Sequence, residues 1–207
     1  MKIEERPSCK RPYSLGRRQG LSDDRRRRIL AVARQRLESD GFLHLTLNAL
    51  ARESGVTRQT IYNLFGTRAG LFEALFDQLA ADGGMGLMRE VMQQAEADSM
   101  LESFVRVFTE FWKKDRLFIR KIHGIAAIDA ELGAAMEARN QRRQAAATRV
   151  IDRLGVWATD VDARNEKIAV LWAMTSFEFF DALALGCGAV DQAADLVWSM
   201  VKRELQR

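Results

Sequence analysis

The chain has few of the residues that break helices or build catalytic and metal sites. Its 207 residues include two Pro, two Cys and two His. Cys9 and Cys187 lie far apart and lack metal-ligand spacing, so we expect neither a disulfide framework nor a zinc site. With only His44 and His123, no phosphate loop and no nucleophile motif, the sequence does not favour an enzyme. We expect no metal and no cofactor.

Long apolar runs and alternating apolar and polar residues are also scarce. The stretch closest to a membrane span is 168–185, which Glu178 and Asp181 interrupt. The N-terminus is basic but has no apolar segment of the kind found in secretory signals. We therefore expect a cytoplasmic protein that does not associate with membranes. Because helix formers dominate and no run alternates long enough to predict a strand, the expected fold class is all-α.

Charge is unevenly distributed along the chain. Residues 1–68 hold 15 Lys and Arg against 7 Asp and Glu, a net charge of +8, whereas residues 69–207 hold 17 against 21, a net charge of −4. A basic first third joined to an acidic remainder indicates that one end meets a polyanion.

The pattern of caps and glycines divides the chain into three parts. Residues 1–21 read as a flexible basic arm, and Ser22 reads as the N-cap of a first helix that ends at Gly41. Residues 22–68 are predicted to form a domain of three helices with a helix-turn-helix, and residues 69–207 a second helical domain.

Short helices are predicted after Thr46 and Thr57, separated by a stop at Gly55. Thr67 begins a fourth helix, which the "DGGMG" segment at 82–86 should end, providing a hinge. Beyond the hinge we expect further helices near 87–96, 99–113, 116–127, 130–154, 161–185 and 190–205.

The helix after Thr57 has an unusual exposed face. Ile61, Leu64 and Phe65 form its apolar stripe, and the opposite face is rich in hydrogen-bonding groups without net charge. The side-chain amides of Gln and Asn can pair with an adenine edge, and Thr can contact a base through its hydroxyl or methyl group. An ordinary helical hairpin with a polar surface is the alternative.

One set of residues, roughly between 24 and 76, follows a recognisable pattern: Gly41-Phe42, Thr46, Leu50-Ala51, Gly55-Val56, Thr57, Tyr62-Asn63-Leu64-Phe65 and Arg68. This pattern resembles the tetracycline-repressor-like (TetR) family of bacterial transcription regulators. By this resemblance, residues 22–68 would form the helix-turn-helix DNA-binding domain and residues 69–207 the helical ligand-binding and dimerisation domain. A late segment, "LWAMTSFEFFDAL" at 171–183, also looks like one of the family. Two residues depart from the family pattern: Leu64 stands where His is usual, and Ala69 where Glu is frequent.

The resemblance implies a role for each residue of the matching stretch. Thr46 and Thr57 would hold helix N-termini against phosphates, Tyr62 would bond a phosphate, and Arg68 would replace the usual Lys. Gln59, Thr60 and Asn63 would face base edges, and Arg58 would reach a base or the backbone. The expected core positions are Phe42, Val56, Ile61, Phe65 and Leu71.

Two basic segments precede this helix. In the arm, Arg11, Arg17 and Arg18 could reach an adjacent minor groove or add only nonspecific attraction from a tail. Arg25–Arg28 could contact phosphates or form solvated helix surface.

The late helices predict a partner surface. Residues 168–185 are apolar nearly all round, and Val197, Trp198 and Val201 form a stripe on the last helix. We expect a homodimer through the last two helices, which would place two recognition helices about 34 Å apart on a palindromic operator in double-stranded DNA. A monomer with a central helix is the alternative.

A small-molecule pocket is implied by the resemblance, although core packing would also account for these side chains. Its candidate residues are Phe108, Phe111, Trp112, Arg120, His123, Trp172, Thr175 and Glu178. Glu178 and Asp181 could meet a cationic ligand, pair with an Arg across the dimer or lie on the surface. The expected function is a ligand-released transcriptional repressor with an unidentified effector; a DNA-binding assembly factor without an inducer, or an activator, are the alternatives.

Overall fold

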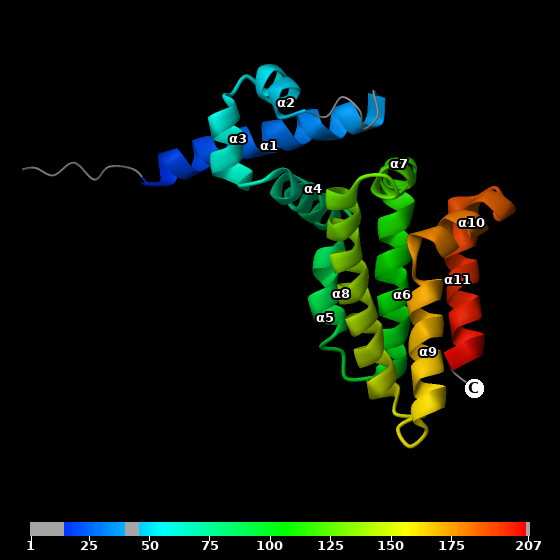
Figure 1. Ribbon diagram of the computed structural model, residues 1–207. Coiled ribbons are helices and arrows are strands. Elements are labelled where there is room, and N and C mark those ends of the chain that lie inside the picture. The colour runs from blue at the N-terminus through cyan, green and yellow to red at the C-terminus, as the bar shows by residue number, and fades with distance from the viewer. Residues whose placement is uncertain (1–14, 40–45, 206–207) are drawn as a thin grey trace, which may run out of the picture.

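The computed structural model describes residues 15–39 and 46–205, and every regular element in these ranges is a helix (Figure 1). The predicted all-α fold class is confirmed. The elements are α1 (Leu15–Ser39), α2 (Leu47–Ser54), α3 (Arg58–Phe65), α4 (Arg68–Asp82), the 3-10 turn η2 (Met85–Leu87), α5 (Met88–Val91), α6 (Ala97–Lys114), α7 (Arg116–Ala126), α8 (Ala130–Leu154), α9 (Val161–Met174), α10 (Phe177–Cys187) and α11 (Val190–Leu205).

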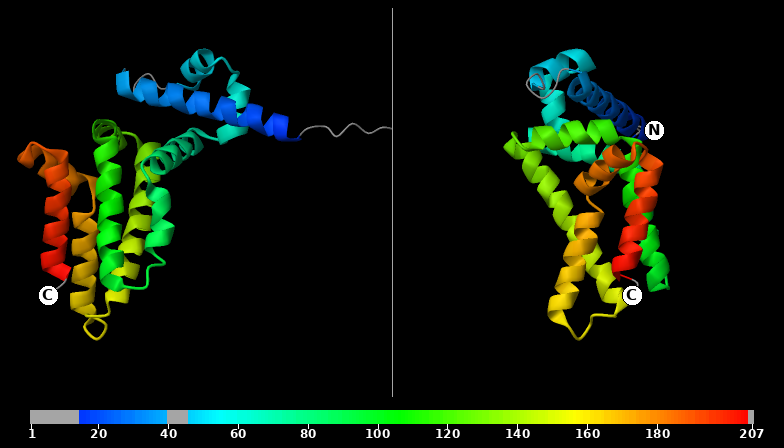
Figure 2. Two further views of the ribbon diagram at one scale, coloured as in Figure 1. Left: turned by 180° about the vertical axis from the view of Figure 1, so that it is seen from behind. Right: turned by 90° about the vertical axis from the view of Figure 1, so that its right-hand side faces the viewer.

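These helices form a head and a body. The head consists of α1, which lies across the top of Figure 1, with α2 and α3 packed on it. The body consists of the long helices α6, α8, α9 and α11, which run side by side in both Figure 1 and Figure 2. Helix α4 leads from the head into the body and packs against both α1 and α8, so any displacement of α4 would move the head.

The buried side chains form two clusters. One fills the body between α6, α8, α9, α10 and α11, with Phe104 and Phe180 fully buried. The other joins the head to the top of the body, because Ile29 and Phe72 share it with Ile122 of α7 and Leu132 of α8. The head thus packs on α7 as well as on α4. The limits at residues 22–68 and 69–207 stay a prediction.

The first helix begins earlier than the sequence indicates. Leu15 is its first residue, so Ser22 lies inside α1 and is not its N-cap, and at least residues 15–21 of the predicted flexible arm are helical. The Arg-rich and Gln-containing segment between Leu15 and Ser22 consists largely of good helix formers, which outweigh the cost of about 1 kcal/mol for each of Gly16 and Gly20.

The prediction of a helix over 87–96 is also wrong, because only the single turn α5 forms there. The Arg153 guanidinium donates to the carbonyls of Met92, Gln94 and Ala95 at 3.2, 2.6 and 3.1 Å. These carbonyls therefore accept hydrogen bonds without the continuation of the helix.

The helix predicted over 161–185 is two helices, α9 and α10, bent by 56° at Thr175–Ser176. The Ser176 side chain caps α10 by accepting from the Phe179 N–H at 3.2 Å, and the Thr175 hydroxyl bonds back to the Leu171 carbonyl at 2.8 Å. Both bonds compete with a continuous helix. Within the described ranges no single helix is long and apolar enough to cross a membrane, and this bent pair meets that test on length and composition only.

Helix α10 is fastened to α7 by a carboxylate between two guanidinium groups. Asp181 accepts from Arg116 Nε at 2.6 Å and from Arg120 Nε and Nη2 at 2.8 and 2.6 Å. Its side chain is only 13% exposed. Burial raises the pKa of Asp181, but the hydrogen bonds from Arg120 and Arg116 outweigh it, so the pKa lies below the ordinary value.

Replacing Asp181 with Asn should lower the free energy of unfolding by about 1–3 kcal/mol, because two guanidinium groups lose a charged acceptor. Because the folded-state pKa is depressed, this contribution is present above the unfolded pKa and is lost as pH falls through the folded value. Urea unfolding of the wild-type and D181N proteins at neutral pH and near pH 3 measures both effects.

The matched control is D191N. Asp191 pairs with Lys113 at 3.0 Å, but its side chain is 81% exposed, so this substitution should leave stability nearly unchanged. Equal losses of unfolding free energy in the two variants would show that the bonds of Asp181 between α7 and α10 stabilise the fold no more than a surface ion pair does.

Candidate functional site

The predicted helix-turn-helix is formed by α2, its turn and α3. The Thr46 and Thr57 side chains cap the two helices, accepting from Ala49 N–H at 3.2 Å and Thr60 N–H at 3.1 Å. Gly55 ends α2 with φ of 66°, a left-handed conformation that favours glycine. Both predicted caps and the predicted stop are confirmed. The exposed N-termini leave backbone N–H groups available to an anion.

Helix α3 buries one face and exposes the other. Ile61 and Phe65 are buried against the head, while Arg58, Gln59 and Asn63 are exposed. Thr60 is half-buried and Tyr62 is 42% exposed. The side chains predicted to face base edges therefore lie together on one accessible surface, although their contact with DNA stays a prediction.

The two amides of this surface are bonded to each other. Gln59 Nε2 donates to Asn63 Oδ1 at 2.9 Å. Both side chains are exposed, and the bond leaves the Gln59 Oε1 acceptor and a donor of Asn63 Nδ2 available. One acceptor and one donor side by side is the pattern that an adenine edge requires.

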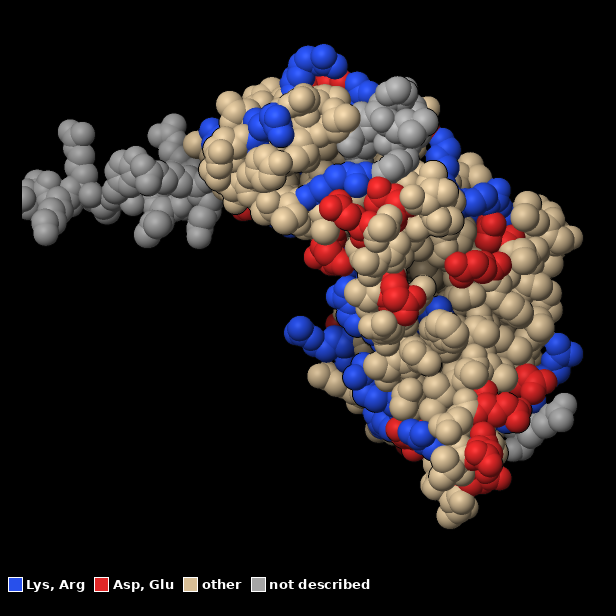
Figure 3. All heavy atoms as spheres, in the orientation of Figure 1, with Lys and Arg blue, Asp and Glu red and all other residues tan. Residues whose placement is uncertain are grey.

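The structure places Arg68, the predicted phosphate contact at the start of α4, against the body. Its Nη1 donates to Asp129 Oδ2 at 3.0 Å and to Glu131 Oε2 at 3.2 Å, and its guanidinium lies over the Phe72 ring. In Figure 3, acidic side chains lie directly below basic ones where the head meets the top of α8. A phosphate contact from Arg68 would therefore compete with these two carboxylates.

The other basic residues of the head differ in their contacts. Arg26 donates to the Leu64 carbonyl at 3.3 Å and lies over the Phe65 ring, so it braces α3. Arg25, Arg27 and Arg28 are exposed. Of the predicted arm contacts, Arg11 and the side chains of Arg17 and Arg18 fall outside what the structure describes.

Three of the expected core positions of the head are buried: Ile61, Phe65 and Leu71. Val56 is half-buried. Phe42 falls outside the described residues.

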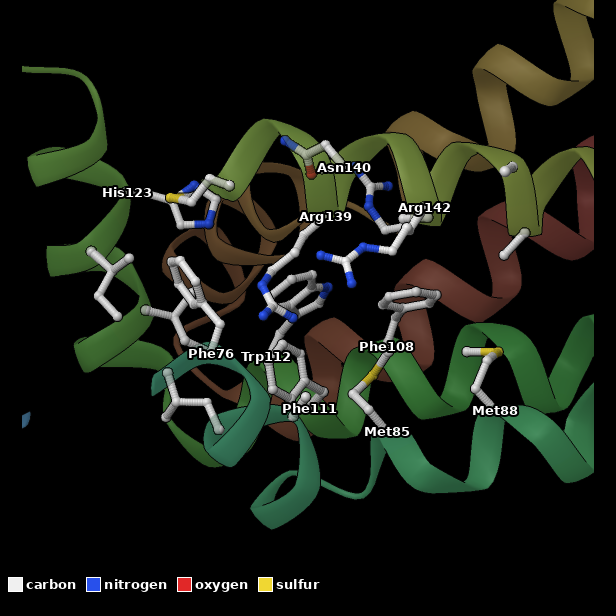
Figure 4. Close-up of a pocket in the computed structure, with 18 of the residues that line it drawn as sticks. Phe76, Met85, Met88, Phe108, Phe111, Trp112, His123, Arg139, Asn140 and Arg142 are labelled. Carbon is white, nitrogen blue, oxygen red and sulfur yellow. Dashed lines mark hydrogen bonds between the residues drawn. The ribbon is translucent and has the colours of Figure 1, made fainter. Parts of the chain in front are cut away.

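A cavity of about 440 Å³ lies between α4, α6, α7 and α8 (Figure 4). This volume is within the range of small-molecule sites. Its walls are mainly aromatic rings and methionines, and its polar side chains come almost entirely from α8. The lining residues are Phe76, Leu79, Ala80, Met85, Met88, Phe108, Phe111, Trp112, Ile119, Ile122, His123, Met136, Arg139, Asn140, Arg142, Arg143, Ala145, Ala146 and Arg149.

The cavity brings together half of the pocket residues that the sequence predicts. Phe108, Phe111, Trp112 and His123 line it. The other four, Arg120, Trp172, Thr175 and Glu178, are not among its lining residues.

Three of those four side chains hydrogen-bond other residues, and the Trp172 Nε1 is buried without a hydrogen-bond partner among the described residues. Arg120 bonds Asp181, and Glu178 accepts from His123 Nδ1 at 2.8 Å. Trp172 and Thr175 lie at the α9–α10 bend, where the Trp172 carbonyl and the Thr175 hydroxyl accept from Arg143. Glu178 and Asp181 thus pair within the chain, and pairing across a dimer is not needed to satisfy them.

The hydrogen bond from His123 lowers the pKa of Glu178 to about 2, with smaller contributions from its own backbone and from Arg143. The Glu178 side chain is 67% exposed, so solvent screening weakens the contribution of this pair to stability. Among the described residues, His, Cys, Asp and Glu do not gather in groups of three that could hold a metal ion.

Sequence reasoning missed the arginines of α8. Arg139, Arg142, Arg143 and Arg149 all line the cavity. Arg142, Arg143 and Arg149 follow Arg139 by three, four and ten residues, which places all four on one side of an alanine-rich helix. This helical spacing is the sequence signal that could have identified them.

Comparison with known proteins agrees with this arrangement. Residues 29–75 match the family model described as "Bacterial regulatory proteins, tetR family". HTH-type transcriptional regulator AlkX of Mycobacterium tuberculosis is 31% identical over an alignment of 125 residues that covers 57% of this chain and 54% of that protein. The chain thus spans about half the length of this curated relative.

A solved structure shares the fold. The crystal structure of a TetR transcription regulator from Haloarcula marismortui superposes with a TM-score of 0.64 at 14% identity, covering 89% of this chain and 97% of that one. The matched segment, residues 29–75, contains all of α2 and α3 and the start of α4. Residues 29–75 therefore belong to the tetR family of bacterial regulatory proteins, as a helix-turn-helix segment that the chain presents at one end of an all-helical fold.

Proposed function

We propose that the protein is a transcriptional repressor that binds double-stranded DNA through α3 and is released by a small-molecule effector. The observation that carries this proposal is the exposed face of α3, where Gln59, Asn63 and Tyr62 are accessible while Ile61 and Phe65 anchor the helix. A solvated helix face needs no such set of uncharged hydrogen-bonding groups, whereas base-edge readout does.

We propose further that two chains associate through α10 and α11, so that two copies of α3 meet a palindromic operator. Leu185 is 63% exposed on α10, and Leu196 and Met200 are only half-buried on α11 outside the body core. Val197 and Val201 cannot serve the interface as first expected, since both are fully buried in their own chain, and Trp198 is half-buried against that same core.

The effector would act through α4. Phe76, Leu79 and Ala80 of this helix line the cavity, and α4 follows directly after α3. A ligand that favours a displaced α4 would shift the heads away from the groove spacing. The hinge at Gly83–Gly84 cannot be tested cleanly by changing both to Ala, because a Cβ at Gly83 would come within 2.3 Å of the Phe111 ring in the cavity wall.

Selection of operators from fragmented genomic DNA by the purified, ligand-free protein at about 150 mM salt tests the proposal. A few enriched fragments sharing a palindrome are expected. Weak, salt-sensitive binding to every fragment would contradict the proposal and favour a DNA-binding assembly factor without an inducer. Reporter expression from a recovered operator distinguishes a repressor from an activator.

A further inference from the structure

The lining of the cavity is positively charged. It contains four arginines and a histidine, and the lining residues include no Asp and no Glu. All four arginines belong to α8, and most of the other lining side chains are apolar; Figure 4 shows Arg139 and Arg142 on this helix. We infer that the effector is an amphipathic anion, an elongated apolar molecule that carries a carboxylate, with its charged end held by Arg143 and its neighbours on α8. This inference rests on the proposed effector site and adds the chemical class of the ligand.

Arg143 is the centre of the inferred anion site. It is 7% exposed, and among the described residues no carboxylate lies within 4.0 Å of its guanidinium. Burial lowers its pKa to about 10, and the nearest acid that counteracts this is Glu178, which is already bonded to His123. A guanidinium buried without an ion pair is costly unless an anion joins it.

The donors of Arg143 are only partly used. A guanidinium carries five N–H donors. Those of Arg143 bond the Trp172 carbonyl, the Thr175 hydroxyl at 3.2 Å and, at a long 3.4 Å, the Asn140 side-chain oxygen. Two donors thus find no acceptor within the described part of the chain, and they are available to a carboxylate.

Arg149 adds a second uncommitted cation at the rim. It lines the cavity, it is exposed, and it makes no hydrogen bond or ion pair with the residues that the structure describes. Because it supports no other part of the fold, its substitution can change ligand affinity without changing stability.

Arg139 connects the anion site to α4. It donates to Glu73 Oε2 at 2.9 Å and Asp77 Oδ1 at 2.8 Å, and both carboxylates belong to α4. Its Nε is buried without a hydrogen-bond partner, and Figure 4 shows its side chain reaching from α8 into the cavity beside Trp112. An anion that attracts Arg139 would weaken its ties to α4, the helix that supports α3.

The apolar part of the ligand would lie against the aromatic wall. Phe111 and Trp112 are 4.7 Å apart between ring centroids, and the Trp112 indole is fixed by its hydrogen bond to the Thr175 carbonyl at 3.0 Å. Met85 and Met88 also line the cavity, and Figure 4 shows them on the same side as Phe108 and Phe111, opposite α8. Flexible methionines beside fixed rings suit an alkyl or aryl chain rather than a compact polar ligand.

Isothermal titration of the full-length protein with decanoate, decanol and decylammonium tests the inference, because the three probes share a chain and differ only in the head group. Decanoate should bind at least about tenfold more tightly than decanol, since hydrogen bonds to a charged acceptor are the stronger ones. Decylammonium should bind most weakly. Decanoate should also release operator DNA at the concentrations at which it binds.

Two variants locate the head group. R149Q should lower decanoate affinity several-fold and leave decanol affinity and the melting temperature unchanged. R143Q should remove most of the preference for decanoate. Because R143Q also loses bonds at the α9–α10 bend and could fail to fold, R149Q keeps the test decisive. The control is R89Q, which changes an exposed arginine of α5 outside the cavity lining.

Equal affinity for decanoate and decanol, a preference for decylammonium, binding of none of the three probes, or unchanged decanoate binding in R149Q would each overturn the inference. These outcomes are separate from the operator selection, which uses ligand-free protein. A palindrome recovered without any preference for decanoate would leave the repressor proposal standing and reject only the anionic ligand. A preference for decanoate without a recovered palindrome would support the anionic ligand and reject the repressor proposal.

Discussion

Replacing Gly70 with Ala is expected to destabilise the head by about 3 kcal/mol, the upper part of the range for overpacking. A Cβ at this position would lie 2.0 Å from the Phe65 carbonyl oxygen and 3.2 Å from its carbon. Both are backbone atoms, so no side chain can move aside. Phe65 ends α3 and Gly70 lies in the first turn of α4, so relief of the clash must change the angle between these helices.

Because that angle sets how α3 meets DNA, G70A should lose operator affinity as well as stability. Chemical denaturation and an operator titration on the same sample measure the two effects. G124A is the matched control, since Gly124 lies within α7 and a methyl group added there would meet nothing within 4 Å. It should stabilise the protein by about 0.5–1 kcal/mol. A G70A protein as stable as wild type would show that the turn between α3 and α4 is loosely packed.

Replacing Asn63 or Gln59 with Ala should weaken operator binding by about 1–3 kcal/mol, or roughly 5- to 150-fold, because each removes either the donor or the acceptor of the proposed base contact. Both side chains are exposed, so the melting temperature should stay within error of wild type. Fluorescence anisotropy with operator and scrambled duplexes separates specific from nonspecific affinity, and only the specific affinity should fall.

The effects of the two substitutions on operator affinity should not be additive. Gln59 and Asn63 are bonded to each other at 2.9 Å, so each single variant also frees its partner, and a double-mutant cycle should show coupling. Q192A, which removes an exposed amide on α11, is the control and should bind operator like wild type. Equal losses on operator and scrambled duplexes would reject base readout by α3.

Much of the head could be predicted from local sequence. Thr46 and Thr57 cap their helices, Gly55 adopts positive φ, and Ile61 and Phe65 are buried as their spacing predicts. Each of these features depends on residues within a few positions of one another. Capping geometry and helical periodicity are local, so they are readable without knowing the fold.

The body was less predictable because long-range partners decide it. The apolar run 168–185 looks continuous, but capping by Ser176, the back-bonded Thr175 and the Arg143 guanidinium stabilise a bend there. The Arg153 side chain likewise donates to the carbonyls of Met92, Gln94 and Ala95, which lie 58 to 61 residues before it in the sequence. No local pattern identifies such partners.

The sequence by itself determined the all-helical class, the two caps of the helix-turn-helix and the polar face of α3, since these follow from propensity, capping and a 3.6-residue period. Only the tertiary structure decided where the charged side chains go. It turned Arg68 toward Asp129, placed Asp181 between two arginines and brought the α8 arginines to an apolar cavity. Charged side chains are long and flexible, and their partners are chosen by proximity in the folded chain rather than by spacing along it.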